Sequence, residues 1–450
     1  MFDLLSDAAE IALEEGPKRL ATRGSEYVKT HSRSLRSAMK FAAADARSDY
    51  PRDDTVMTTL RSSTFDSDTL SLVLLASECP WVKTVYLAVS SREHFYHYHE
   101  PILSCFRDLD VSIKVVETHT RVFVSAFLRS RIVFLRGRPD LLHYRFLNRN
   151  PERKFVILYH GIITKASGNL RQDSLKRQER MRRSSIEYQP PGKYLSRLST
   201  LTHARPVGSD IEVFYRATAD GIKPSFLKKC GYPKYDRLQQ LIRGEDDPIL
   251  SEEAAEALAS DRVAHRILYA PTHKGGDAVT SLFPFSDFDV EQLRKTLEAL
   301  DAELYVRVHI SEEEAGLYDD VVDGETIRYA GHEFSPSSVE ILPYFDVLVT
   351  DYSSIYTEYL PLDRPVVFVE DTENPYWKNK GIAYDYEKYF PGPKVGSFEA
   401  FEDELEASLE DASRYRDERQ FVSRALVPDA DNDFFECVSA AVGITESPPQ

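Results

Sequence analysis

The sequence predicts an α/β protein with two domains, each built around a doubly wound parallel sheet. Short apolar runs rich in β-branched residues recur along the chain, and helix-length segments separate them, as parallel sheets require. This alternation occurs twice, over 61–240 and over 264–420, and the charged stretch 241–263 between them is predicted to be a linker. A chain of 450 residues can bury two cores of this kind.

Residues 1–60 are expected to form a helical amino-terminal segment. Apolar residues between Leu4 and Leu20 recur with loose helical periodicity, and a basic, polar stretch follows to about Ser48. A helix packed on the body of the protein explains this pattern. A membrane-surface helix is the alternative, although the apolar face is thin and lacks Trp.

The first domain begins with 70–75, which the pattern leaves open as helix or strand. The segments after it are clearer, because apolar β-branched runs alternate with amphipathic ones. The predicted strands are 84–89, 111–117, 131–135 and 155–159, and the predicted helices are 96–107, 121–129 and 208–218.

His160 directly follows the last of these strands, and Gly161 comes next. In open α/β sheets, ligands collect at the carboxyl ends of the strands, and a glycine allows a ligand to approach closely. A histidine at this position is therefore a candidate general base. A purely structural histidine is the alternative, and this motif alone leaves both open.

A basic stretch over 165–197 stands out in an acidic chain. Residues 1–200 hold 32 Lys and Arg against 23 Asp and Glu (net +9), and 201–450 hold 24 against 50 (net −26), which together give −17. The stretch is either a solvated loop and helix or a contact for a polyanion or lipid headgroups. Nucleic acid is not expected, because few aromatic residues are interleaved. Its candidate contact residues are Lys165, Arg180, Arg182 and Arg183.

The second domain opens with the predicted strand 266–270 and the turn 271–277. Thr272 and Lys274 in this turn supply a hydroxyl donor and a cation, which suit a phosphate or a sugar. A later strand ends in a second histidine, His309. The other predicted elements of this domain are helices 291–300 and 399–409 and strands 304–309 and 366–369. A carboxyl-terminal segment over 421–450 contains the predicted helix 433–442, and one option is that it crosses back to the first domain.

The stretch 346–369 carries the second candidate site. Its start, 346–350, is predicted to be a buried strand, and 355–362 is predicted to be the helix after it. Between them, Asp351, Ser353 and Ser354 supply N-cap chemistry. A helix start directs free N–H groups and positive dipole charge toward an anion, so this turn is a candidate phosphate site, and an ordinary capped helix is the alternative.

Composition excludes several classes of protein. No run of about eighteen apolar residues occurs, so no transmembrane helix is expected, and the amino terminus lacks a signal-peptide pattern. Cys79, Cys105, Cys230 and Cys437 are scattered with no close pair. We therefore expect neither a disulfide framework nor a zinc site, and a reducing cytoplasm fits.

In order and spacing, these motifs resemble those of the CDP-glycerol glycerophosphotransferase family, which includes the teichoic-acid polymerases and primases. Thr350-Asp351-Tyr352-Ser353-Ser354 followed by Leu362-Asp363-Arg364-Pro365 is the most specific block. The resemblance covers roughly residues 125–440. The weaker motifs are His160-Gly161 with Lys165 and Gly168, Gly231-Tyr232-Pro233 with Asp236, Tyr269-Ala270-Pro271-Thr272, and Arg307 with His309.

The chain departs from the family pattern at several positions. Tyr159 replaces the usual Trp, and Ile162-Ile163-Thr164 replaces Thr-Pro-Leu, so the changes around His160 bear on the acceptor more than on the reaction. The others are Lys234-Tyr235 for Arg-Asn, His273-Lys274 for Trp-Arg and Ile310 for a common Pro.

The resemblance implies a GT-B-like fold, in which two Rossmann-like domains face a cleft with the acceptor on the first and the CDP donor on the second. It implies that His160 and His309 are the catalytic pair. His160 would take the proton of the acceptor hydroxyl, and His309, with Arg307, would stabilise the phosphoryl oxygens while CMP leaves. Thr272, Lys274, Asp351, Ser353 and Ser354 are expected at the donor phosphates, and Glu358 at the ribose; this scheme requires no metal or other cofactor.

The expected function is therefore transfer of glycerol phosphate from CDP-glycerol to a hydroxyl of a membrane-linked or polymeric acceptor. The enzyme would lie peripherally on the cytoplasmic face of the cell membrane, against an anionic surface. One alternative is a GT-B glycosyltransferase or nucleotide-sugar epimerase, and the other is a non-catalytic membrane-surface module. The sequence identifies neither the acceptor nor the oligomeric state, nor does it separate single transfer from polymerisation.

Overall fold

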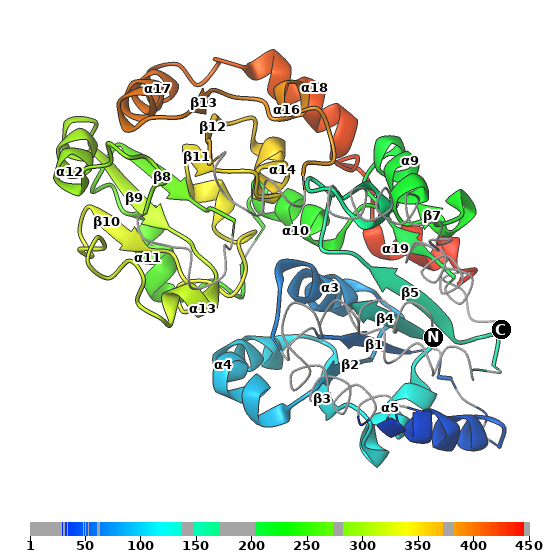
Figure 1. Cartoon of the computed structure of the whole chain (residues 1–450). Helices are drawn as coiled ribbons and strands as arrows, with labels where there is room; N and C mark the ends of the chain where they lie inside the picture. Colours follow the sequence, from blue (N-terminus) through cyan, green and yellow to red (C-terminus); the bar gives the residue numbers. More distant parts are fainter. Residues whose placement is uncertain are drawn as a thin grey trace, which may run out of the picture.

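A computed structural model shows two parallel sheets in separate lobes that meet near helices α10 and α14 (Figure 1). These helices span Pro233–Ile242 and Ile355–Tyr359. The structure describes residues 29, 32–33, 35–47, 49, 51–52, 54–60, 64–136, 148, 150–171, 203–245, 247–272, 282–371 and 381–444.

The first lobe contains a five-stranded parallel sheet in the order β3-β2-β1-β4-β5. Its central strand, β1, corrects the prediction of a wholly helical segment over 1–60, although 35–45 are helical. All five residues of β1 are buried, and three are threonines, which hid the strand from a search for apolar runs. The strands are β1 (Thr55–Thr59), β2 (Thr84–Val89), β3 (Ser112–Glu117), β4 (Ile132–Arg136) and β5 (Lys154–Leu158).

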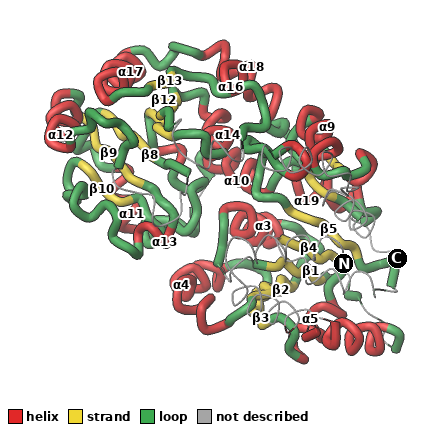
Figure 2. The backbone as a smooth tube through the Cα atoms, in the orientation of Figure 1, coloured by secondary structure: helices red, strands yellow, loops and turns green. Residues whose placement is uncertain are grey.

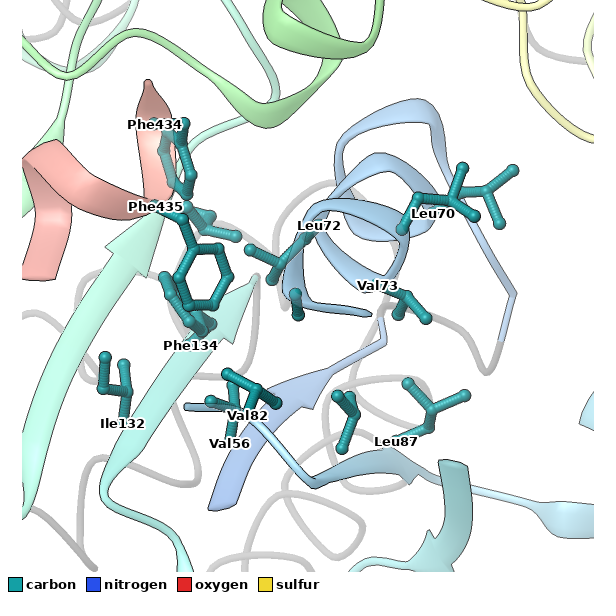
Figure 3. Packing of buried hydrophobic residues seen from close by; sticks show 14 of the residues in the cluster. Val56, Leu70, Leu72, Val73, Val82, Leu87, Ile132, Phe134, Phe434 and Phe435 are labelled. Atoms are coloured by element: carbon teal, nitrogen blue, oxygen red, sulfur yellow. The ribbon is translucent and has the colours of Figure 1, made fainter. Parts of the chain in front are cut away.

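Helices cover both faces of this sheet (Figure 2). On one face, α3 packs with α19 over apolar residues of β1 and β4 (Figure 3). On the other, α5 packs with the helix over 35–45. The segment 70–75, left open by the sequence, is helical because it lies within α3. The helices are α3 (Ser67–Glu78), α4 (Arg92–Cys105), α5 (Arg121–Arg129) and α19 (Phe434–Ala441).

The second lobe contains a six-stranded parallel sheet in the order β10-β9-β8-β11-β12-β13. The sequence did not predict β10 and β13, because two or three residues are too few to show a pattern. The strands are β8 (His265–Tyr269), β9 (Ala302–Val306), β10 (Ile327–Tyr329), β11 (Val347–Thr350), β12 (Val366–Val369) and β13 (Lys394–Val395). The helices include α12 (Val290–Ala299), α13 (Ile310–Glu313), α16 (Tyr386–Tyr389), α17 (Phe398–Glu410) and α18 (Arg416–Leu426).

The segment between the sheets is packed rather than open. It holds a small two-stranded sheet, and one of its helices, α10, contacts α3 of the first lobe while Tyr235 and Leu238 enter the core of the second. The predicted linker 241–263 contains α11, whose Leu258 is also buried in that core while its Glu256 is exposed. The elements are β6 (Arg205–Pro206), β7 (Leu227–Lys228), α9 (Asp210–Ala219) and α11 (Glu252–Ala259).

The carboxyl-terminal helix α19 lies on the first lobe, where Phe434 and Phe435 pack near Phe134 (Figure 3). A disulfide joins Cys230 to Cys437 there, with their Cα atoms 5.4 Å apart. The expectation of no disulfide was therefore wrong. The two cysteines are 207 residues apart, and only the return of the chain brings them together. Among the described residues, no helix is long and apolar enough to cross a membrane.

Candidate active site

A cavity of about 420 Å³ lies where the two lobes meet. The loop after β5 supplies most of its lining, and Ser354, after β11, supplies a wall from the second lobe. The carboxyl ends of these strands are where open α/β sheets bind ligands. The lining residues are 159–168, Arg171, Arg216 and Ser354.

His160 is exposed in this cavity and is held from behind by a buried arginine. Gly161 has a φ of 101°, and a Cβ at this position would lie 2.4 Å from Lys234 Nζ, so glycine is required. Arg136, at the end of β4, places Nη2 3.0 Å from His160 Nδ1. Because a guanidinium only donates, Nδ1 is the acceptor, and the neutral ring carries its proton on Nε2.

Arg136 is buried and belongs to an ion cluster beneath the cavity. Its Nη1 lies 3.0 Å from Asp68 Oδ2, its Nε bonds to Asp66, and its guanidinium also donates to the carbonyl of Tyr159. Burial would raise the pKa of Asp66, but the Arg136 charge and the N–H of Thr69 hold it below its ordinary value. The cluster therefore carries fixed charge and orients His160.

Lys234 extends this cluster into the second lobe. Its Nζ is 2.5 Å from Glu358 Oε1 and 3.9 Å from Asp68 Oδ2. Ser338 Oγ donates to the other oxygen of Glu358 at 3.2 Å and lies 3.2 Å from Ser67 Oγ of the first lobe. Burial lowers the pKa of Lys234, but Asp68 and Glu358 raise it by more. The carboxylate of Glu358 is buried and is held by Lys234 and Ser338 in this structure, and its contact with a ribose stays a prediction.

The turn after β11 is held by Asp351 rather than by serine caps. Asp351 Oδ1 accepts hydrogen bonds from Thr272 N (3.0 Å), Thr272 Oγ1 (2.7 Å) and Ser353 N (2.9 Å). Ser354 occupies the N-cap position of α14, but its side chain makes no capping hydrogen bond. Asp351 and Thr272 thus shape this turn, and Ser354 lies in the lining of the cavity.

Lys165 lies between the lobes. Its Nζ is 3.2 Å from Thr272 Oγ1 and 5.6 Å from the centre of the Tyr352 ring. The adjacent backbone is tied to the second lobe as well, since Ala383 N donates to Thr164 O at 2.9 Å. Its cation therefore faces the turn after β11 in this structure, and its assignment to the acceptor or membrane side stays a prediction.

Arg307 stabilises a loop of the second lobe. Its guanidinium donates to the carbonyls of Ala330 (2.8 Å) and Ser335 (3.1 Å). Burial lowers the pKa of Arg307 to about 10, although the carboxylate of Glu340 opposes this shift. In this conformation the guanidinium holds backbone carbonyls, and its contact with the donor stays a prediction.

His309 is exposed and precedes α13. Its backbone N–H bonds to Glu312 Oε2 at 3.2 Å, and its carbonyl accepts from Glu312 N at 2.8 Å, so this segment is a capped helix start. Beyond α13, Glu314 accepts a hydrogen bond of 2.7 Å from Tyr98 Oη of α4, which links the lobes. The residues lining the described cavity include His160 but not His309, so the predicted pair does not share that cavity here.

Four predicted residues, Lys274, Arg180, Arg182 and Arg183, lie outside the described residues. The sequence reasoning missed Arg136 and Lys234 as site residues. Arg136 carried a usable signal, since it is a charge at the end of an apolar strand next to the histidine strand. Lys234 was noted only as a departure from a motif. Among the described residues, no group of three His, Cys, Asp or Glu side chains could hold a metal ion.

Curated relatives of this chain include teichoic acid polymerases, transferases and primases. The teichoic acid ribitol-phosphate polymerase TarL of Staphylococcus aureus is 25% identical over 224 residues, which cover 48% of this chain and 37% of the relative. The teichoic acid glycerol-phosphate primase of Bacillus subtilis is 24% identical over 264 residues, which cover 58% and 61%. The chain thus matches less than two thirds of the length of each of these relatives.

Solved structures share the whole fold. The wall teichoic acid polymerase TagF, as a histidine-to-asparagine variant with CDPG, matches with a TM-score of 0.66 and 16% identity over 94% of this chain and 96% of that chain. A putative UDP-N-acetylglucosamine 2-epimerase from Listeria monocytogenes matches with a TM-score of 0.50 and 15% identity, over 88% and 98%. These similarities confirm the predicted GT-B-like fold of two Rossmann-like domains. The family model for CDP-glycerol:poly(glycerophosphate) glycerophosphotransferases matches residues 52–439, and the chain belongs to this family.

Proposed function

We propose that this protein transfers glycerol phosphate from CDP-glycerol to a hydroxyl group of a membrane-linked or polymeric acceptor and releases CMP, in the synthesis of a cell-surface polymer. The observation that carries the proposal is the cavity between the lobes, which is lined by His160, Lys165 and Ser354. It combines a histidine, cations and a helix start, which suit phosphoryl transfer.

In the proposed reaction, the acceptor oxygen forms a bond to the β-phosphorus of CDP-glycerol. The bond from this phosphorus to the bridging oxygen breaks, and CMP leaves with that oxygen and the bonding electron pair. The proton of the acceptor hydroxyl passes to His160. Lys165 stabilises charge on the phosphoryl oxygens, and closure of the lobes brings His309 to the same group.

The contact between Arg136 and His160 sets a condition on this step. With Nδ1 accepting from Arg136 and Nε2 protonated, neither ring nitrogen takes up a proton until that contact opens. We therefore expect substrate to shift Arg136 from Nδ1. Nitrogen-15 NMR of the His160 ring, with and without CDP-glycerol, measures this, and an unchanged Nε2–H tautomer in the donor- and acceptor-bound enzyme contradicts the base role.

Charges of the chain, not a metal ion, neutralise the donor phosphates in this scheme. Lys165 and Arg171 line the cavity. We accordingly propose that no metal or other cofactor is needed, and that turnover persists after EDTA treatment. Loss of turnover in EDTA with recovery on adding Mg²⁺ would overturn this part of the proposal.

The proposed location is the cytoplasmic face of the cell membrane, with the enzyme bound peripherally. The basic stretch containing Arg180, Arg182 and Arg183 supports attraction to anionic lipid. Neutralising these three residues is expected to abolish salt-sensitive binding to phosphatidylglycerol vesicles. Unchanged vesicle binding would show that the basic stretch does not contact the membrane.

A donor panel tests the proposed activity. Purified protein is incubated with membrane extract and labelled CDP-glycerol, CDP-ribitol or UDP-N-acetylglucosamine, and the labelled product is identified. We expect transfer from CDP-glycerol with release of CMP. Preference for CDP-ribitol would correct the polyol, turnover of only the UDP-sugar would favour a glycosyltransferase or epimerase, and vesicle binding with no turnover of any donor would indicate a non-catalytic module.

A further inference from the structure

A second cavity, of about 560 Å³, lies on the first lobe apart from the candidate active site. One wall comes from helical residues 33, 36, 37 and 40, and the other comes from the turn after β3 and the start of α5. The two walls bring together the cationic side chains of Arg33, Arg36, Lys40 and Arg121, with His119 beside them.

The amino-terminal helix holds its basic side in place because its other side is part of the core. Ala38 and Phe41 are fully buried and pack with Phe127 of α5. Asp45 forms a buried ion pair with Arg153, with Nη1 and Oδ1 3.0 Å apart. Residues 38, 41 and 45 have the i, i+3, i+7 spacing of one helix face, and 33, 36 and 40 have the same spacing on a separate face.

The cations of this cavity have no carboxylate among its described lining residues. In the described part of the chain, none of Arg33, Arg36, Lys40 and Arg121 takes part in an ion pair within 4.0 Å, whereas elsewhere arginines such as Arg153 and Arg136 are paired with acids. Like charges held this close repel one another, and a bound anion relieves the repulsion. The start of α5, a nine-residue helix, adds N–H groups and positive dipole charge to the same wall.

We propose that this cavity binds phosphate-ester groups. Arginine forks match the geometry of phosphate oxygens, and a lysine adds a mobile point charge. The turn that holds His119 follows β3 as the loop of His160 follows β5, so both lie at the carboxyl edge of one sheet. Four strand spacings separate them, or about 19 Å.

The distance between the basic cavity and His160 would allow an acceptor with repeating phosphate groups to contact both. A chain of polyol phosphates would place one phosphate in the basic cavity while its terminal hydroxyl reaches His160. The use as an acceptor contact rests on the proposed function, but binding of phosphate esters does not. A lipid phosphate headgroup has the same chemistry and is the other source of such a group.

A charge-neutralised variant, R36Q/K40Q/R121Q, tests the site by direct binding. The matched control K83Q/R107Q/K223Q removes three exposed cations of the same lobe that do not line the cavity. Circular dichroism and thermal unfolding establish that each variant is folded. The probes are a soluble glycerol phosphate oligomer, by calorimetry, and phosphatidylglycerol vesicles, by sedimentation, both at low salt.

We expect the cavity variant to bind at least one of these probes about tenfold or more weakly than wild type, while the control stays close to wild type. Loss of oligomer binding assigns a polymeric phosphate, and loss confined to vesicles assigns a lipid headgroup. Equal binding of both probes by wild type and the cavity variant, or an equal loss in the control, overturns the site. The binding measurement needs no donor, so it tests the phosphate-ester site even if the protein does not turn over CDP-glycerol.

Discussion

The two sides of the cleft use their polar residues differently. On the first-lobe side, His160 is exposed and the loop 159–168 lines the cavity. On the second-lobe side, most residues of the matched motifs bond to other parts of the protein: Asp351 to Thr272, Glu358 to Lys234, and Arg307 to backbone carbonyls. Thus, in this structure, these second-lobe side chains hold other parts of the protein in place.

Residues of the block Leu362–Pro365 also bond to other parts of the protein. Arg364 donates to the carbonyls of Pro343 and Phe345, and Asp363, with a φ of 50°, contacts Arg419 at 3.2 Å. These contacts fix the position of α14 and hence of Ser354. The comparison indicates that substitutions around the turn after β11 will mainly affect stability and donor affinity, whereas substitution of His160 will affect the chemical step.

The largest expected effect on stability comes from the ion pair that crosses the lobes. Lys234→Met leaves the buried carboxylate of Glu358 uncompensated and is expected to lower the free energy of unfolding by about 3–5 kcal/mol. Denaturant unfolding measures this change. The control is Lys229→Met, whose exposed pair with Asp210 is expected to contribute no more than about 1 kcal/mol.

The double variant Lys234→Met/Glu358→Leu sharpens this test. Removing both charges is expected to recover part of the loss, because the unpaired buried carboxylate is then absent. A Lys234→Met protein as stable as wild type would show that the pair does not join the lobes as described.

The disulfide is expected to have the next largest effect. Reduction of Cys230–Cys437, or Cys437→Ser, releases a constraint between residues 207 apart and is expected to destabilise the protein by about 2–4 kcal/mol. Thermal unfolding with and without dithiothreitol measures it, with Cys105→Ser as the control. If dithiothreitol and Cys437→Ser both leave the unfolding temperature unchanged, the bond is not a stabilising feature.

Asp236 gives a smaller effect that depends on pH. Burial raises its pKa to about 7, although the N–H of Phe434 favours the charged form. The folded protein therefore holds a proton that the unfolded chain releases near pH 4, so stability falls as pH rises from about 4 to about 7. Asp236→Asn is expected to reduce this slope. Part of the pH dependence of stability is expected to remain in this variant, because burial also raises the pKa of Glu340 to about 7.

Unfolding measured at several pH values between 4 and 8 checks this prediction. An unchanged slope in Asp236→Asn would mean that the carboxyl titrates in the folded protein as it does in the unfolded chain.

The smallest expected effect is at the phosphate turn. Thr272→Val removes the hydroxyl that donates to Asp351 and accepts from Lys165, and it is expected to cost about 1 kcal/mol of stability. We also expect a higher KM for the donor with little change in kcat. A large fall in kcat at unchanged KM would assign Thr272 to the chemical step and contradict the scaffold role.

Most of the architecture was predictable because apolar β-branched runs indicate buried strands. The strands 84–89 and 366–369 and the helix 121–129 were predicted with the bounds that the structure has. β1 was missed because its threonines obscured a strand buried on both faces. Position in sequence located His160 correctly, since it follows a strand end.

Side-chain partners could not be predicted in the same way. Nothing local indicates that Glu358 meets Lys234, 124 residues away, or that Arg136 meets His160. Those contacts arise from strand order and from the docking of the lobes. Cap chemistry was expected of Asp351, Ser353 and Ser354 alike. In the structure the carboxylate of Asp351 accepts from Ser353 N, whereas Ser354 makes no capping hydrogen bond.

A single-turnover experiment tests the division between the two sides most directly. CMP release from labelled CDP-glycerol, with acceptor present, is measured for wild type, His160→Asn and Ser354→Ala. Thermal unfolding first establishes that both variants are as stable as wild type. We expect His160→Asn to lower the rate by about 10²–10⁴-fold with donor binding retained, and Ser354→Ala to lower it by less than about tenfold. A His160→Asn protein that releases CMP at the wild-type rate would contradict the account.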